Sequence, residues 1–270
     1  MVARAPKGKG KAKAKRPLLA SHQRSWLWGR NLVLETLAGG RWPIHELYLA
    51  ADLGADAAAD EIAQAGAAGR KFKLNRVPRT RLAQLCGVAD HQGFLARVGE
   101  YPYDAPAALY GDPRATSLWL ILDGVQDPYN LGAMLRSAEV FGIDGVFLGA
   151  KGQAGVNSLA ARSSAGAVNR LRIARADDLA ALVIQLRREA VVVVGTSVTA
   201  DYAIDGCDFS GPIALVIGNE SEGMSPAVSN ACNMLAKIPQ VGGLNSLNAA
   251  AAAAVCLYEI RRQRRGMAFA

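Results

Sequence analysis

The stretch LDGVQDPYNLGAMLRSAE, residues 122–139, joins the end of an apolar run to the start of an amphipathic segment. The run LWLIL (118–122) has the length and composition of a buried strand. The spacing of apolar residues after the polar loop predicts a helix over 130–142, with Asn130 as its N-cap. We therefore expect a strand, a loop and a helix in direct succession, which is the repeating unit of an α/β fold.

The same unit repeats along the C-terminal half of the chain, where apolar runs alternate with helical patterns. This alternation predicts a parallel sheet that is covered by helices on both faces. The predicted strands are 118–122, 145–149, 171–174, 191–195, 213–218 and 235–239, and the predicted helices are 130–142, 156–166, 177–189, 223–232 and 245–264. Ligands bind such sheets beyond the carboxyl ends of the strands. The polar loops expected there are 123–130, 196–197, 218–223 and 239–246.

A smaller mixed α/β module is predicted before this sheet, over residues 24–100. Its predicted elements are a helix and a strand within 27–50, a helix at 56–69, a strand and a helix within 70–87, and a closing strand at 91–99. The Pro-rich segment 101–116 has no clear periodicity and predicts a linker. The second domain would then occupy residues 117–270.

The net charge of +8 is concentrated at the N-terminus. Residues 1–30 carry nine of the 31 Lys and Arg residues and no acid, so the rest of the chain holds 22 basic and 23 acidic residues. The segment KGKGKAKAKR (7–16) lacks the apolar stretch of a secretory signal. We interpret residues 1–23 as a disordered basic arm that binds a polyanion by counterion release. A solubilising extension and a mitochondrial transit peptide are the alternatives.

The composition argues against membrane and metal proteins. No apolar run approaches the roughly 18 residues that span a bilayer, so we expect a cytoplasmic protein with no membrane association. The three histidines and the scattered cysteines do not have the spacing of a zinc site, and we expect free buried thiols and no metal. A cysteine nucleophile stays open, although no neighbouring motif supports one. The cysteines are Cys86, Cys207, Cys232 and Cys256.

Two further motifs place polar residues at the ends of predicted strands. LVIGNESEGMS (215–225) ends a strand at Gly218 and continues with two glutamates, which form either a paired acid/base or an ordinary helix N-terminal turn. IPQVGGLNSLNAAAAAAV (238–255) combines a Gly-Gly turn with the start of a helix. The amides and hydroxyl that it gathers there belong to Asn245, Ser246 and Asn248.

Taken together, the three motifs read N-x-G-x-x-x-R, I-G-N-E-x-E-G and I-P-x-x-G-x-x-x-S-L-N. In this order they resemble the SpoU family of RNA ribose 2′-O-methyltransferases, in the TrmH-like branch of the SPOUT class. The resemblance spans residues 118–265; IPQVGG in place of the commoner Ile-Pro-Met start is a departure, as are the alanines after Ser-Leu-Asn. WGRNLVLETL and HQGFLARV resemble the L30e-like substrate-binding domain of bacterial enzymes that methylate a guanosine in 23S ribosomal RNA.

The resemblance implies a deep trefoil knot, a homodimer with sites near the subunit interface, and AdoMet as the methyl donor. Consistent with a knotted site, the Gly-x-Gly-x-Gly turn of the more common AdoMet-dependent methyltransferases does not follow the first strand of the sheet. The catalytic residues implied are Asn130, Arg136, Glu220, Ser246 and Asn248. The cofactor-binding residues implied or expected are Thr196, Ser197, Gly218, Asn219, Ile238 and Leu247.

Arg136 has two functional interpretations and two structural ones. A guanidinium fork suits a phosphate beside the target ribose, where it would orient the 2′-oxygen. Its pKa above about 12 makes it a reluctant base, although the resemblance implies a direct part in activating the hydroxyl. The structural alternatives are an ordinary surface arginine and an ion pair with Glu139.

The segment RKFKLNRVPRTR (70–81) holds six basic residues and one aromatic. It predicts phosphate contacts and base stacking, with a solvated charged face as the alternative. The RNA-binding residues expected there are Arg70, Lys71, Phe72, Lys73, Arg76 and Arg79. By contrast, RRQRR (261–265) complements a helix dipole and is expected to be structural.

The resulting hypothesis is methylation of a guanosine of 23S ribosomal RNA, met as a precursor or assembly intermediate. One alternative is a ribose methyltransferase that acts on tRNA or on another ribosomal site. Another is a non-catalytic RNA-binding protein of ribosome assembly. Binding of AdoMet would separate an enzyme from a protein that only binds RNA.

Overall fold

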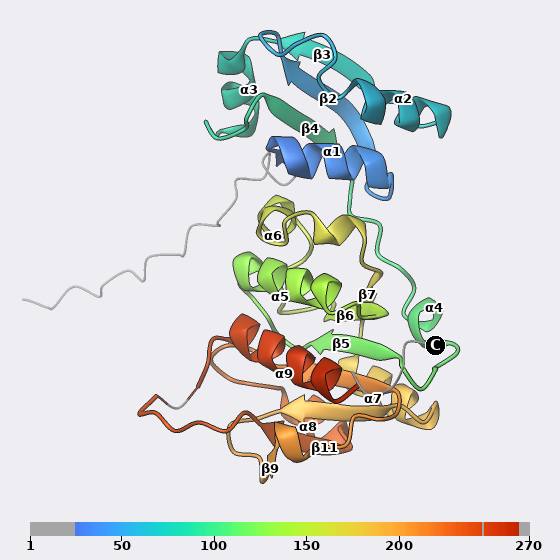
Figure 1. Ribbon diagram of the computed structural model, residues 1–270, viewed down its shortest axis with the longest axis vertical. Helices are drawn as coiled ribbons and strands as arrows, with labels where there is room; N and C mark the ends of the chain where they lie inside the picture. Colours follow the sequence, from blue (N-terminus) through green and yellow to red (C-terminus); the bar gives the residue numbers. More distant parts are fainter. Residues whose placement is uncertain (1–24, 245, 265–270) are drawn as a thin grey trace, which may run out of the picture.

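The computed structural model describes residues 25–244 and 246–264. The expected basic arm, Asn245 and residues 265–270 lie outside the described residues. The described chain forms two sheets that follow one another along the long axis of the molecule (Figure 1). None of the described helices is long and apolar enough to cross a bilayer.

The smaller sheet has the strand order β1-β4-β2-β3. Its strands are β1 (Trp26–Trp28), β2 (Ile44–Ala50), β3 (Lys73–Val77) and β4 (Phe94–Val98), and its helices are α1 (Arg30–Gly39), α2 (Ala59–Ala67) and α3 (Arg79–Cys86). β2 and β3 are parallel, whereas β4 runs antiparallel to β1 and β2. The expected mixed α/β module is therefore present, with one strand, β1, that the sequence did not predict.

The larger sheet has seven strands, all parallel, in the order β7-β6-β5-β10-β8-β11-β9. This confirms the predicted α/β class. The strands are β5 (Leu118–Leu122), β6 (Gly145–Gly149), β7 (Ile173–Ala176), β8 (Val192–Thr196), β9 (Tyr202–Ala203), β10 (Ile213–Ile217) and β11 (Met234–Lys237). β5 and β6 coincide with the residues predicted for them.

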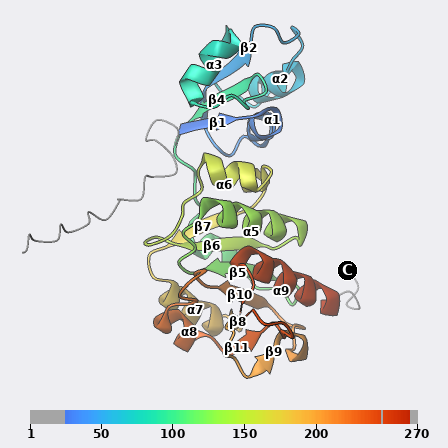
Figure 2. The same cartoon turned by 90° about the vertical axis from the view of Figure 1, so that its left-hand side faces the viewer.

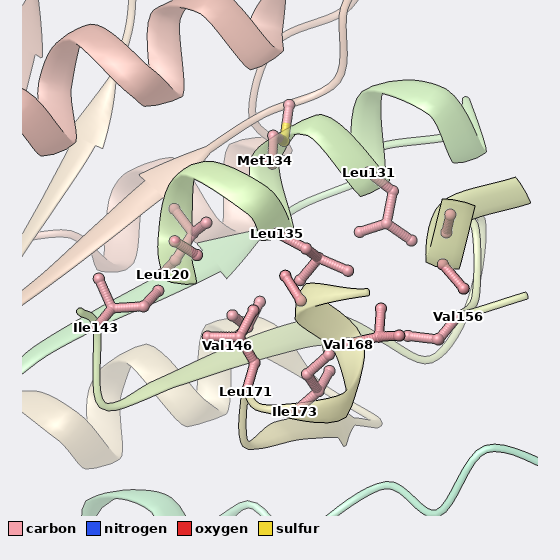
Figure 3. Close-up of a cluster of buried hydrophobic side chains, with 14 of the residues drawn as sticks. Leu120, Leu131, Met134, Leu135, Ile143, Val146, Val156, Val168, Leu171 and Ile173 are labelled. Atoms are coloured by element: carbon pink, nitrogen blue, oxygen red, sulfur yellow. The ribbon is translucent and has the colours of Figure 1, made fainter. Parts of the chain in front are cut away.

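Helices cover the larger sheet on both faces (Figure 2). One face carries α5 (Pro128–Val140), α6 (Ser158–Ser163) and α9 (Ala249–Arg264), and the other carries α7 (Leu179–Arg188) and α8 (Pro226–Ala231). Under α5, Leu131 and Leu135 pack among buried side chains of the sheet such as Val146 (Figure 3). The remaining short elements are α4 (Ala107–Tyr110), η2 (Ala167–Asn169) and η3 (Ile204–Gly206).

The N-terminus of α5 corrects one expectation. The helix begins at Pro128, and its N-cap is Asp127, whose side chain accepts a hydrogen bond from the Tyr129 N–H. Asn130 was predicted as the cap, but an Asp-Pro pair is a strong helix start because the proline lacks an N–H that would need a partner. The Asn130 side chain is consequently available for other contacts.

The segment predicted as a linker packs closely against the larger sheet. The Tyr101 hydroxyl donates to the Val168 carbonyl over 2.7 Å, and the Tyr103 hydroxyl accepts from the Val156 N–H over 2.8 Å. The two sheets are therefore joined by an ordered connection.

Part of the basic C-terminal run is structural, as expected, because the buried Arg264 guanidinium donates to backbone carbonyls of neighbouring loops.

Candidate active site

A cavity of about 490 Å³ lies at the carboxyl ends of β8, β10 and β11. Its walls include residues 196–199, 217–224, 236–238 and 246–247. These stretches are remote in sequence, but parallel strands bring their carboxyl ends to the same edge of a sheet. The second and third motifs of the sequence therefore meet in one place.

Gly218 shapes the middle of this cavity. A Cβ added there would lie 2.3 Å from the backbone carbon of Gly223, so only glycine permits the close approach of the two backbones. Asn219 and Gly223 then pair through backbone hydrogen bonds of 2.9 and 3.0 Å. The result is a tight turn over 219–223 that presents its backbone at the wall of the cavity.

The Asn219 side chain ties the loop after β10 to the loop after β5. Its Nδ2 donates to the Gly124 carbonyl over 2.7 Å, and its Oδ1 accepts from two backbone N–H groups of its own turn. Asp123 adds a second link, since its Oδ2 accepts from the Ser225 N–H over 2.7 Å. Asn219 lines the cavity, and its side chain is already engaged in holding these loops together.

Three predicted catalytic residues form one hydrogen-bonded network. Nδ2 of Asn130 donates to Oε1 of Glu220 over 2.8 Å, and Nδ2 of Asn248 donates to Oδ1 of Asn130 over 3.1 Å. Oδ1 of Asn248 accepts from the N–H groups of Ala250 and Ala251, so that Asn248 also caps α9. The first, second and third motifs are thus connected side chain to side chain.

Arg136 lies apart from this network. It is exposed on α5 and is not among the residues that line the cavity. The alternative of an ion pair with Glu139 is wrong: among the described residues Glu139 pairs with Arg170, over 3.3 Å, and not with Arg136. Among the described residues, the Arg136 side chain makes neither a hydrogen bond nor an ion pair. Its guanidinium is available to a molecule outside this chain.

All six residues predicted to contact the cofactor line the cavity, as do Glu220 and Ser246. Those six are Thr196, Ser197, Gly218, Asn219, Ile238 and Leu247. The sequence missed Met224 and Lys237, which also line it. Lys237 is the last residue of β11 and directly precedes Ile238 of the third motif. The sequence alone does not tell which side chains at the end of a strand face the cavity.

The residues predicted to bind RNA separate into two groups. Nη1 of Arg70 donates to the Leu37 carbonyl, Arg76 donates to carbonyls of the loop 53–55, and Arg79 forms an ion pair of 2.7 Å with Asp52. These guanidiniums therefore already have partners within the chain. Lys71 and Lys73 are exposed, and Phe72 is half-buried.

The cysteines are free, as expected. Burial raises the pKa of the Cys232 thiol to about 11 and that of Cys256 to about 12. Burial also raises the pKa of Cys86 and Cys207. These thiols are protonated near neutral pH, which disfavours a cysteine nucleophile. Within the described residues, no group of three or more His, Cys, Asp or Glu side chains is placed to hold a metal ion.

Comparison with known families and proteins agrees with this geometry. Residues 117–258 match the SpoU rRNA methylase family, and residues 26–104 match the RNA 2′-O ribose methyltransferase substrate-binding family. An uncharacterized tRNA/rRNA methyltransferase of Mycolicibacterium vanbaalenii is 37% identical over 96% of this chain and 84% of that protein. A putative TrmH family tRNA/rRNA methyltransferase of Bacillus subtilis, YacO, is 33% identical over 90% of this chain and 98% of that protein.

Solved structures share the fold of this chain. An AdoMet-bound rRNA methyltransferase of Sinorhizobium meliloti has a TM-score of 0.74 at 27% identity, covering 88% of this chain and 87% of its own. The AdoMet-bound SpoU methyltransferase AviRb of Streptomyces viridochromogenes has a TM-score of 0.74 at 28% identity, covering 89% and 90%. The Aquifex aeolicus TrmH/SpoU tRNA modifying enzyme matches with a TM-score of 0.52 at 25% identity, covering 58% and 79%. On these matches, and on three motifs that meet beside one cavity, the chain belongs to the SpoU family of RNA methyltransferases.

Proposed function

We propose that this chain transfers the methyl group of AdoMet to a ribose 2′-hydroxyl of RNA, and that the target is a guanosine of 23S ribosomal RNA. The observation that carries the proposal is the network of Asn130, Glu220 and Asn248, which unites the three SpoU motifs beside the cavity. The match of the N-terminal module to a family of RNA 2′-O ribose methyltransferase substrate-binding domains supports the choice of the ribose oxygen.

The cavity fits AdoMet in size and in the chemistry of its walls. Its 490 Å³ lies within the roughly 300–1,000 Å³ of typical ligand sites. Ile217, Ile238 and Leu247 supply apolar surface, while Glu220 and Glu222 supply negative charge suited to a cationic sulfonium. Bound there, AdoMet supplies an activated methyl group. Gly218, Thr196 and their neighbours would hold it.

The residues of the chain would then contribute alignment and proton acceptance. Alignment of two bound reactants lowers a barrier by up to roughly 7–11 kcal/mol, whereas a positioned base adds about 10²–10⁴-fold. The network holds Asn130 and Glu220 at fixed positions at the edge of the cavity, where we propose they orient the ribose. We assign the 2′-oxygen and its adjacent phosphate to Arg136. Whether Arg136 also accepts the proton stays a prediction.

A homodimer is part of the proposal, because Arg136 is exposed and does not line the cavity of its own chain. The same surface of α5 and α9 exposes large apolar side chains, with Val140 67% exposed and Tyr258 46% exposed. Tyr258 lies beside Phe141 at a ring distance of 6.4 Å, so both helices contribute to one surface. A second copy seated on that surface would cover it and bring Arg136 to the cavity of the partner.

The finer architecture belongs to the same proposal. We propose a substrate-binding domain at 24–100, a linker at 101–116 and a methyltransferase domain at 117–270 that contains the trefoil knot. Residues 1–23 are assigned to electrostatic capture of RNA in the cytoplasm. Loss of that arm should flatten the dependence of RNA affinity on salt concentration.

A tRNA substrate is the second candidate, supported by relatives that are named tRNA/rRNA methyltransferases. The shared architecture favours ribosomal RNA. The rRNA methyltransferase of S. meliloti covers 88% of this chain, whereas the tRNA modifying enzyme of A. aeolicus covers 58%. A substrate that requires both domains would explain the difference.

The test is to incubate the purified chain with labelled AdoMet and total RNA from a strain that lacks the gene. A 2′-O-methyl group blocks alkaline cleavage at its own nucleotide, so the modified position can be mapped directly. We expect one alkali-resistant guanosine in 23S ribosomal RNA. Label on tRNA would favour the second candidate, and label on a base would contradict ribose methylation.

A further inference from the structure

A second cavity, of about 230 Å³, lies within the N-terminal module. It is formed where the C-terminal end of α1, the start of β2 and the segment 70–72 meet. Two cations and no acid line it, and its other walls are apolar side chains, backbone and Thr36, whose hydroxyl is already bonded to the Leu32 carbonyl and to Asn169. The residues that matter below are Gly40, Trp42, Arg70, Lys71 and Phe72.

Arg70 is held at this wall by the end of α1. Its Nη1 donates to the Leu37 carbonyl over 2.5 Å, and a Cβ added to Gly40 would lie 2.2 Å from the same nitrogen. Gly40, at a φ of +65°, therefore both ends the helix and makes room for the guanidinium. The Nε of Arg70 is buried and has no hydrogen-bond partner. One charged donor thus remains to be satisfied beside the cavity.

Two aromatic side chains, Trp42 and Phe72, form apolar walls of the cavity. Trp42 is buried, and its Nε1 is already used by the Gly99 carbonyl, so it offers the cavity only apolar surface. Phe72 is half-buried, packs against the main hydrophobic core and lines the cavity. An apolar group that enters would therefore meet aromatic surface on these walls.

Lys71 supplies an uncommitted charge at the same place. It is exposed, and among the described residues it has no ion pair or hydrogen bond. Arg76 and Arg79, a few residues further on, are engaged by the loop 53–55 and by Asp52. Within the basic segment, free charge and aromatic surface therefore coincide at Lys71 and Phe72.

We propose that this cavity binds one unstacked nucleobase of the RNA substrate, against Phe72, with the adjoining phosphate on Lys71. The proposal rests on the proposed function, since it assigns to RNA a site in the domain that captures the substrate. Aromatic side chains and cations are how proteins hold the splayed bases of single-stranded RNA. At 230 Å³ the cavity is below the roughly 300 Å³ of drug-sized sites, which suits one base. The buried Nε of Arg70 would donate to an acceptor on that base.

The experiment uses the full chain with Lys71→Gln, Phe72→Leu and the control Arg188→Gln, which removes an exposed arginine of α7 outside the basic segment. The probes are a short single-stranded oligoribonucleotide that contains 2-aminopurine and the blunt duplex of the same sequence. We expect Phe72→Leu to weaken single-strand binding about 5- to 100-fold, from the loss of one stacked base, and to reduce quenching of 2-aminopurine. Lys71→Gln should reduce the slope of log affinity against log salt by about 0.7, the value for one single-strand phosphate.

Measurements of methyl transfer distinguish a failure of this proposal from a failure of the proposed function. On ribosomal RNA, both variants should raise KM and leave kcat near that of Arg188→Gln, because the site binds RNA away from the reacting atoms. Lys71 is exposed, so its substitution keeps the fold, and thermal unfolding checks Phe72→Leu. If the unaltered chain transfers methyl groups and both variants bind and react like the control, the cavity has another occupant, such as a protein side chain, and the proposal is wrong. An unaltered chain that binds the single strand but methylates no RNA contradicts the proposed function instead.

Discussion

Single residues decide whether the cavity is an active site. Arg136 is the most informative, because it has no partner among the described residues and lies outside the cavity of its own chain. An exposed arginine with only a structural role would be replaceable. A guanidinium that grips the reacting ribose and phosphate would not be.

We predict that Arg136→Ala lowers methyl transfer by about 100-fold or more, the scale of a positioned catalytic group. Binding of AdoMet, measured by calorimetry, should be unchanged because Arg136 does not line the cavity. Arg188→Ala, at an exposed position on α7, is the matched control and should keep full activity. Near-normal turnover of Arg136→Ala would remove Arg136 from the reaction.

A substitution at Gly218 tests whether the wall of the cavity binds AdoMet. Gly218→Ala places a Cβ 2.3 Å from the backbone of Gly223, and relief of this clash must displace the turn over 219–223. We expect a loss of about 1–3 kcal/mol in the free energy of unfolding, together with weakened AdoMet binding. Gly211→Ala is the control, since a Cβ there meets no atom within 4 Å. Equal AdoMet affinity in the two variants would contradict the assignment.

At the scale of elements, the sequence was most informative where a pattern was long and local. β5 and β6 were predicted residue for residue, because their short apolar runs, LWLIL and GVFLG, each begin directly after a polar residue. β1 and β9 were missed, since three and two residues are too short to show a period. The Asp127 cap was missed because Asn130 and Asp127 are both good caps, and only the proline between them decides.

The convergence of the three motifs was predictable from the sequence, whereas the partners of the basic residues were not. Motifs at strand ends converge because parallel strands share an edge, and this brought the expected cofactor residues to one cavity. The engagement of Arg76 by the loop 53–55 was not predictable, because its partners are backbone carbonyls that any sequence could supply. The same holds for the Leu37 carbonyl that accepts from Arg70.

The start of α5 provides a prediction for an element. Asp127→Ala removes the side-chain acceptor of the Tyr129 N–H and should cost about 0.5–2 kcal/mol in urea unfolding. It should also lower activity, because Asn130 lies in the first turn of the same helix. Asp178→Ala removes the equivalent cap of α7, away from the cavity, and should lower stability alone. A fully active Asp127→Ala would show that the position of Asn130 does not depend on the cap.

At the scale of the whole molecule, the two sheets are fastened to each other rather than loosely tethered. Nδ2 of Asn169 donates to the Thr36 hydroxyl over 3.0 Å, and Arg170 bridges Glu35 of α1 and Glu139 of α5. The helix that carries Arg136 is thus linked to the module expected to bind RNA. The surface formed by α5 and α9 exposes large apolar side chains, and we propose that a second copy of the chain covers it.

The most direct measurement is a mixed dimer of one Arg136→Ala chain and one Gly218→Ala chain, at an AdoMet concentration too low for either chain alone to be active. If Arg136 serves the cavity of its partner, each mixed dimer keeps one site with both residues intact. Random mixing should then restore about a quarter of the activity of the unaltered chain in methyl transfer to ribosomal RNA. If the mixture stays as inactive as either chain alone while mixed dimers form, Arg136 does not act across the interface, and the proposed site is wrong.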